Sequence, residues 1–361
     1  MQYTGQILDG QMHGKGKLVY ENGESYTGDW VRGKRHGKGE YIYSDGSVFD
    51  GAWENDRING DGTSHYPNGN RFEGQWLNGK INGNGTLYLA SGDKYVGEWK
   101  DGRRQGQGIY YYSDGDCYQG EWRNDERHGK GIMTYSSSDS RNDVQEKYDG
   151  EWSEGKMHGR GIYSYCDGSS YDGLWVLGKM HGKGVFIYPN GNRYDGEFQN
   201  DMKEGYGILQ YTNGERYEGQ WKSNFANGTG TLIYADGDKY MGGWLDGKKN
   251  GIGELHYING DKFCGNWEED RASGKGSLEY ANGDVYEGDW ESDQRSGRGK
   301  FISAETNITY DGNWKDGVKN GDGVMIFPTG DSITGRWKGG IIDGPVLYNF
   351  SSKSPWRDPE Y

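Results

Sequence analysis

The chain has 361 residues, a formal net charge of −14 and only 31% hydrophobic residues, a balance that by itself favours disorder. The 14 Trp and 30 Tyr overturn that first interpretation, because large rings can supply the buried area that scarce aliphatic residues do not. The acidic balance also argues against a nucleic-acid binder, and 67 Gly against 6 Pro excludes a collagen helix.

Segments that point to a membrane, a disulfide framework or a zinc cluster are absent from the sequence. No run of 18 apolar residues occurs, and the first residues lack the charged and then apolar layout of a signal peptide. The three cysteines, Cys117, Cys166 and Cys264, are odd in number, widely spaced and without a Cys-x-x-Cys pair. We therefore expect a protein of the cytoplasm, a reducing compartment.

One motif, aromatic-x-Gly-x-Trp, recurs along almost the whole chain. Most of its intervals are 23 residues. A longer interval falls where residues 136–147 enlarge a turn, and a 24-residue interval falls near 305–309. We predict a single array of fifteen repeats over residues 3–350, followed by a polar tail, 351–361. The repeats begin at Tyr3, Tyr26, Phe49, Phe72, Tyr95, Tyr118, Tyr148, Tyr171, Tyr194, Tyr217, Tyr240, Phe263, Tyr286, Tyr310 and Ile333.

Each repeat reads as a β-hairpin. In the second repeat, Tyr26, Gly28 and Trp30 share a period of two, and so do Gly37 and Gly39 with the tyrosines that follow them. This alternation places rings and glycines on one face, where a ring from a neighbouring strand can lie over bare backbone. Asn-Gly and Asp-Gly dipeptides between repeats predict tight turns that join successive hairpins antiparallel. The predicted fold class is therefore all-β, a single antiparallel sheet of stacked hairpins.

These residues carry a family resemblance. The pattern Tyr-x-Gly-x-Trp-x-x-Gly-x-x-x-Gly-x-Gly, followed by Asp-Gly or Asn-Gly, resembles the MORN repeat (membrane occupation and recognition nexus). Ile7 and Phe198 replace the Trp, and Gly344-Pro345-Val346 breaks the Gly-x-Gly. The resemblance implies an elongated, twisted, single-layer sheet. A chain filled with repeats looks like the protist cytoskeletal MORN scaffolds of the apicomplexan basal complex and the kinetoplastid hook complex, which implies homodimers or higher assemblies.

No catalytic or metal site is predicted. The repeated Gly-x-Gly is not followed by the helix that a phosphate-binding loop requires, and the recurrent histidines occupy one duplicated turn position. His256 and Cys264 flank one turn and could supply two metal ligands, too few for a closed site within one chain. An intermolecular metal site at these two residues stays open. We expect no cofactor and no enzymatic activity.

Cations recur between the paired strands of the repeats. Two interpretations stand: solvated turn residues that discourage sheet association, or an edge that binds anionic lipids such as phosphoinositides. The cations are Lys34, Arg35, Arg57, Lys80, Arg103, Arg104, Lys156, Lys179, Lys248 and Arg271.

The last repeat departs from the others, because aliphatic and aromatic residues gather where earlier repeats carry charge. One interpretation is a cap over the final strand, in which Pro345 removes a hydrogen-bond donor. The favoured one is a two-fold interface between two chains, since exposed apolar clusters mark association. The predicted interface residues are Ile333, Ile341, Ile342, Val346, Leu347 and Phe350.

Together these features predict a non-enzymatic cytoskeletal scaffold that self-associates and links membrane-associated structures to cytoskeletal protein partners. Two alternatives are a phosphoinositide-binding peripheral membrane protein and a radial-spoke or axonemal MORN component. We expect the protein in the cytoplasm, on the cytoskeleton or at a membrane surface.

Overall fold

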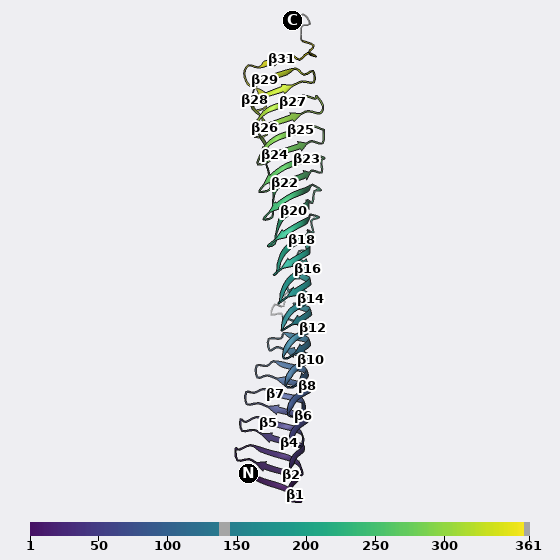
Figure 1. Ribbon diagram of the computed structural model, residues 1–361, viewed down its shortest axis with the longest axis vertical. Coiled ribbons are helices and arrows are strands. Elements are labelled where there is room, and N and C mark those ends of the chain that lie inside the picture. Colours follow the sequence, from purple (N-terminus) through teal and green to yellow (C-terminus); the bar gives the residue numbers. More distant parts are fainter. Residues whose placement is uncertain (137–144, 357–361) are drawn as a thin grey trace. The chain divides into compact units, whose positions relative to one another are not determined.

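The fold is all-β. The computed structural model describes residues 1–136 and 145–356. Within that part of the chain there are 31 strands and no helix, so nothing in it forms an apolar helix long enough to cross a membrane. The chain divides into two compact units, unit 1 (Met1–Gly182) and unit 2 (Lys183–Tyr361). Figure 1 shows hairpin following hairpin within each unit. The predicted all-β antiparallel array of hairpins is confirmed.

The strands alternate between seven and nine residues until the last hairpin. In unit 1 they are β1 Gln2–Leu8, β2 Gln11–Val19, β3 Ser25–Val31, β4 Lys34–Ile42, β5 Val48–Glu54, β6 Arg57–His65, β7 Arg71–Leu77, β8 Lys80–Tyr88, β9 Lys94–Lys100, β10 Arg103–Tyr111, β11 Cys117–Arg123, β12 Glu126–Thr134, β13 Lys147–Ser153, β14 Lys156–Ser164 and β15 Ser170–Val176. The strand at the boundary of the units is β16 Lys179–Ile187.

In unit 2 the strands are β17 Arg193–Gln199, β18 Met202–Gln210, β19 Arg216–Lys222, β20 Phe225–Ile233, β21 Lys239–Leu245, β22 Lys248–His256, β23 Lys262–Glu268, β24 Arg271–Glu279, β25 Val285–Glu291, β26 Gln294–Ile302, β27 Thr309–Lys315, β28 Val318–Ile326, β29 Ser332–Lys338, β30 Ile341–Ile342 and β31 Leu347–Asn349. The enlarged turn predicted at 136–147 falls largely on residues 137–144, outside the described residues.

The turns differ from the prediction. The two-residue turns lie within each hairpin, as at Arg32 and Gly33, whose φ angles of 49° and 77° match the twist of the flanking strands. The segment between the paired strands, which was expected to include Lys34 and Arg35, therefore shrinks to Arg32 and Gly33. The Asn22-Gly23 type of dipeptide does lie at a turn, but in the longer connection Tyr20–Glu24, which is closed by bonds from the amide of Tyr20 to the carbonyl of Glu24 and from the amide of Gly23 to the carbonyl of Tyr20.

A ladder of edge-to-face rings forms the core of each unit. Tyr26 is fully buried, and its ring centroid lies 5.1 Å from that of Trp30 and 5.3 Å from that of Trp53 in the next hairpin. The pattern repeats at Phe49, which contacts Trp53 and Trp76 in the same way. Each such ring pair contributes about 0.5–1.5 kcal/mol beyond its buried area. Stability is therefore shared between adjacent hairpins.

The glycines make room for these rings. Gly28 on β3 pairs with Gly39 on β4, and a side chain at either position would overlap the ring of Tyr26. A ring from the neighbouring strand covers bare backbone at Gly39, as predicted, whereas at Gly28 the ring belongs to the same strand, β3. The prediction is wrong for Gly37. Gly37 lies in a bulge with φ 61°, and a side chain there would meet the carboxylate of Asp29 instead.

The bulge is capped by the residue between the Gly and the Trp of the motif. The carboxylate of Asp29 accepts a 3.1 Å hydrogen bond from the amide of Lys38, and Glu98 and Glu121 accept equivalent 2.9 Å bonds from Gln107 and Lys130. These bonds pair amides that the bulge removes from the strand ladder, which explains why acidic residues and Gln recur at this position.

Candidate functional site

The predicted basic edge divides into two groups. Eight of the ten cations are exposed and begin the second strand of a hairpin, directly after the two-residue turn: Lys34, Arg57, Lys80, Arg103, Lys156, Lys179, Lys248 and Arg271. We call these eight the turn-edge cations. The first six belong to unit 1 and the last two to unit 2.

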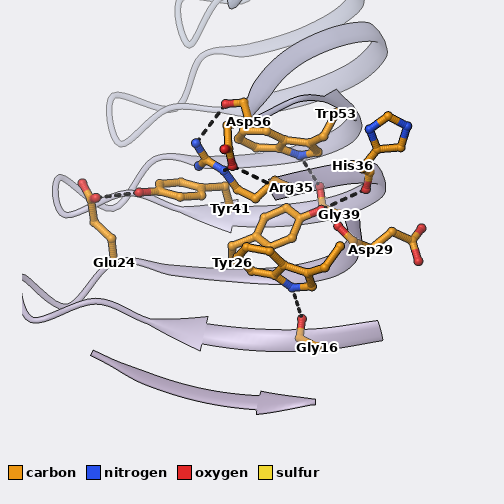
Figure 2. A network of polar contacts seen from close by, with 11 residues as sticks. Gly16, Glu24, Tyr26, Asp29, Arg35, His36, Gly39, Tyr41, Trp53 and Asp56 are labelled. Carbon is orange, nitrogen blue, oxygen red and sulfur yellow. Dashed lines mark hydrogen bonds and ion pairs between the residues drawn. The ribbon is translucent and has the colours of Figure 1, made fainter. Parts of the chain in front are cut away.

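Arg35 and Arg104 do not lie at that edge. The guanidinium of Arg35 lies 4.3 Å from the ring centroid of Trp53, and its Nε donates a 3.2 Å bond to the carboxylate of Asp56 (Figure 2). Arg104 repeats the arrangement, 4.4 Å from Trp122 and bonded to Asp125. Because the second strand alternates its faces, a residue one position beyond the exposed cation turns onto the aromatic face. These two arginines serve packing between hairpins.

Acidic neighbours reduce the positive field of the turn edge. The ammonium of Lys80 lies 3.7 Å from the Asp101 carboxylate, and that of Lys248 lies 3.3 Å from the Glu269 carboxylate. Both acids belong to the turn of the next hairpin, so opposite charges alternate along this edge. Such a surface attracts anionic lipids less strongly than a row of cations alone.

Polar contacts also join neighbouring hairpins at the opposite edge. The carboxylate of Glu24 accepts a 2.6 Å bond from the Tyr41 hydroxyl and a 3.3 Å bond from the Ser44 amide of the next connection. The bond from Tyr41 holds the pKa of Glu24 below its usual range, while burial is the main cause that raises the pKa of Tyr41. Asp93 makes the same two contacts with Tyr110 and Ser113.

The C-terminal end of unit 2 is an incomplete hairpin. After β29, the expected nine-residue strand is replaced by β30 and β31, each paired with β29, because Gly344 takes φ 97° and Pro345 follows it. Most of the predicted interface residues are exposed here: Ile341 at 73%, Ile342 at 42%, Leu347 at 62% and Phe350 at 52%.

Two members of the predicted interface lie elsewhere. Ile333 is buried at 8% exposure, because it occupies the core position that a ring fills in other hairpins and pairs with Tyr348 across β31. Val346 is half-buried against Gly335. The sequence interpretation missed Tyr348 and Trp356, both exposed. We call Ile341, Ile342, Leu347, Tyr348 and Phe350 the C-terminal patch.

His256 and Cys264 lie on β22 and β23, the two strands that one connection joins. Their nearest partners are nevertheless other residues. The Nε2 atom of His256 lies 3.0 Å from the Glu254 carboxylate, and Glu254 pairs in register with Cys264. Across residues 1–136 and 145–356, no three His, Cys, Asp or Glu side chains gather in a metal-binding group. The intermolecular metal site stays a hypothesis.

The face opposite the aromatic ladder carries mixed charge. In unit 2, a groove of about 640 Å³ crosses β23 to β27 and is lined by Lys275, Arg298 and Lys300 together with Glu287 and Asp311. Two of these cations are paired, Lys275 with Asp289 at 2.6 Å and Arg298 with Asp311 at 3.3 Å. Its charges therefore largely neutralise one another.

These observations define a repeat scaffold in which each hairpin is completed by its neighbours. The MORN repeat family matches residues 3–140, 148–306 and 310–332 in fourteen consecutive units, so the chain belongs to that family. MORN repeats are scaffold repeats and not catalytic units. The fifteenth predicted unit, which begins at Ile333, lies beyond these matches and coincides with the incomplete hairpin.

Similarity to individual known proteins is weak. No curated protein matches the sequence. Among solved structures, the chain is similar to the TCP domain of Drosophila melanogaster SAS-4 in complex with a proline-rich motif of Ana2, at 17% identity and a TM-score of 0.29, covering 44% of this chain and 85% of that one. The TCP10 domain of Danio rerio CPAP matches at 10% identity and a TM-score of 0.21, covering 74% and 99%.

Proposed function

We propose that the chain is a non-enzymatic scaffold that self-associates through the C-terminal patch and links membrane-associated structures to cytoskeletal protein partners. This role follows that of the protist MORN scaffolds the sequence resembles. The observation that carries the proposal is the exposure of Ile341 and Leu347, at 73% and 62%, on β30 and β31, two short edge strands that also carry Ile342 and Tyr348.

Self-association is tested by light scattering on the full chain. Ile341→Glu with Leu347→Glu places two charges in the patch, and because both side chains are exposed, the fold should survive. We expect a dimer for the wild type and a monomer for the double variant. Ile258→Glu is the matched control, since Ile258 is also 73% exposed and lies far along the sequence from the patch. A monomeric wild type, or a dimer that survives both substitutions, would refute the interface.

The membrane link rests on the turn-edge cations. Each cation near an anionic surface contributes on the order of 1 kcal/mol, and added salt screens this attraction. Arg57, Lys80 and Arg103 changed to Glu should abolish co-sedimentation with phosphoinositide vesicles at physiological salt. The control changes Lys15, Lys38 and Lys130, exposed cations on the face opposite the aromatic ladder in unit 1, to Glu. Equal loss in both triple variants would show non-specific attraction, and equal binding by wild type and the first variant would assign the cations to solvation.

An axonemal location is the alternative within the same structural class. The repeat array is equally compatible with the axoneme and with a membrane-linked cytoskeletal structure. Localisation of a tagged copy in cells distinguishes the two locations.

A further inference from the structure

One position of the hairpin holds a long side chain that covers the Trp of the next hairpin. Arg35 fills this position in unit 1, and Lys203 and Lys249 fill it in unit 2, each with its ammonium 4.3 Å from the centroid of Trp221 or Trp267. Other hairpins use an apolar side chain, such as Ile58, which belongs to the core. The chain itself therefore shows which side chains fit this space, which we call the slot.

Ala226 occupies the slot position between Lys203 and Lys249, and its methyl group leaves the space unfilled. A cavity of about 280 Å³ lies there. Its walls include Tyr217, Leu232, Trp244 and Gly247, which correspond in the 23-residue repeat to Tyr26, Tyr41, Trp53 and Asp56 around Arg35. The cavity is thus the volume that the side chain of Arg35 occupies in its own hairpin.

The turn residue next to the cavity is Gly247, which supplies no carboxylate for a cationic occupant. Where the slot holds Arg35, the following turn supplies the Asp56 carboxylate. Where it holds Ile58 or Met157, the turn has a glycine whose amide donates to the carbonyl of the slot residue at 2.8 Å. Ala226 belongs to the second class, because the amide of Gly247 donates to its carbonyl at 2.9 Å. In unit 1 the chain fills slots of this class with apolar side chains, as at Ile58 and Met157, and also with Arg127, which lies 4.3 Å from the ring centroid of Trp152. At Ala226 the neighbouring cation Lys203 disfavours a second positive charge, so an apolar occupant fits better there.

One wall of the cavity carries a cation without an acidic partner. Lys203 lines it, and the residue that corresponds to Asp56 is Asn224, whose Oδ1 accepts only the backbone amide of Lys203 at 2.8 Å. No carboxylate of the described residues forms an ion pair with this ammonium, and burial lowers the pKa of Lys203 to about 8. A carboxylate brought to this wall would stabilise the charged amine.

We propose that the cavity at Ala226 receives an apolar side chain of a partner protein, and that a carboxylate next to that side chain in the partner pairs with Lys203. The inference rests on the proposed scaffold function, in that the ligand is a protein, but it uses neither the C-terminal patch nor the turn-edge cations. Phe225, 54% exposed, lines the same cavity and adds apolar contact area.

The test uses short peptides in a Gly-Ser background that carry Met-Asp, Met-Asn or Ala-Asp, added to the full chain. Binding is followed by the indole N–H signals of Trp244 and Trp53 in NMR spectra. We expect the Met-Asp peptide to shift the signal of Trp244 and leave that of Trp53 in place. The Met-Asn and Ala-Asp peptides should each bind at least about tenfold more weakly, because each lacks one of the two contacts.

Two variants and one control complete the experiment. Ala226→Met fills the cavity as Met157 fills its slot, so it should abolish binding and raise the melting temperature. Lys203→Met should bind Met-Asp and Met-Asn peptides equally. Ala235→Met adds the same side chain at an exposed site in the connection between β20 and β21. It should change neither peptide binding nor the melting temperature. Retained binding by Ala226→Met, or binding of sodium octanoate but of no peptide, would overturn the proposal. Ala226→Met should equal the wild type in light scattering and in vesicle binding. The proposal of a partner at the cavity and the proposed scaffold function can therefore fail independently of each other.

Discussion

The indole nitrogen of Trp53 donates a 3.0 Å hydrogen bond to the carbonyl of Gly39, a residue of the preceding hairpin (Figure 2). Trp30 makes the same bond to Gly16 at 3.1 Å, and Trp122 to Gly108 at 3.2 Å. Each of these three Trp residues thus ties its hairpin to the one before it through both a ring contact and a polar bond, whereas the buried indole nitrogen of Trp76 has no hydrogen-bond partner. A single hairpin lacks these partners, so the stability of each hairpin depends on the hairpin next to it.

Gly39→Ala should lower the free energy of unfolding by about 1–3 kcal/mol, because the new methyl group overlaps the ring of Tyr26. A double-mutant cycle with Tyr26→Leu isolates the cause, since a smaller partner relieves the overlap. We expect the double variant to lose less stability than the sum of the two single losses, as measured by denaturant unfolding. Additive losses would show that the ring and the glycine act independently.

Arg35→Ala should cost about 1–2 kcal/mol, because the guanidinium packs over Trp53 and bonds to Asp56. Lys34→Ala is the control from the adjacent position, and as an exposed substitution it should change stability by no more than about 0.5 kcal/mol. Thermal unfolding of both variants gives the comparison. Equal effects would contradict the division of the cations into exposed and packed groups.

Lys203→Met should stabilise the protein at pH 7 by about 2 kcal/mol, allowing for partial exposure of the ammonium. Burial lowers the pKa of Lys203 in the folded state to about 8, so below that pH folding carries the cost of burying a charge. As the pH rises from about 8 towards the unfolded pKa near 10.5, the folded state loses its proton first and this cost disappears. The advantage of the variant should therefore shrink over that range. A difference that is constant with pH would show that the charge does not matter.

Alkaline pH should unfold the protein cooperatively. Burial raises the pKa of Tyr110, Tyr234 and Tyr310 to about 12, and raises that of Tyr26 further. Since the folded state keeps these protons longer than the unfolded state, their stabilisation is complete below the ordinary tyrosine pKa of about 10 and declines above it. Absorbance of tyrosinate should rise together with the loss of β-sheet circular dichroism. Ionisation of most tyrosines before any unfolding would contradict their burial.

The period of two along Tyr26, Gly28 and Trp30 was enough to predict the hairpins and the common face of rings and glycines. It could not place Arg35 and Arg104, because the short turn and the bulge at Gly37 together decide which residues of the second strand face the rings. Alternation alone does not reveal a bulge. Ile333 was misplaced for a related reason. It occupies the core position of the repeat, although the residues that follow it no longer match the motif. The cavity at Ala226 does leave a sequence signal, a small residue at a position that holds long side chains in most other hairpins, although Ala272 shares that signal.

The most direct test of self-association through the C-terminal patch is a distance measurement between two copies of the chain. A spin label at Asn349→Cys on β31, in a chain with Cys117, Cys166 and Cys264 changed to Ser, reports dipolar coupling between partner chains. A tail-to-tail pair predicts strong coupling between labels at position 349, which should vanish with Ile341→Glu and Leu347→Glu. A label at Leu8→Cys on β1, mixed with the label at 349, tests instead for a head-to-tail contact between chains. Absence of coupling at position 349, or coupling only between a label at 349 and one at 8, would contradict the two-fold interface.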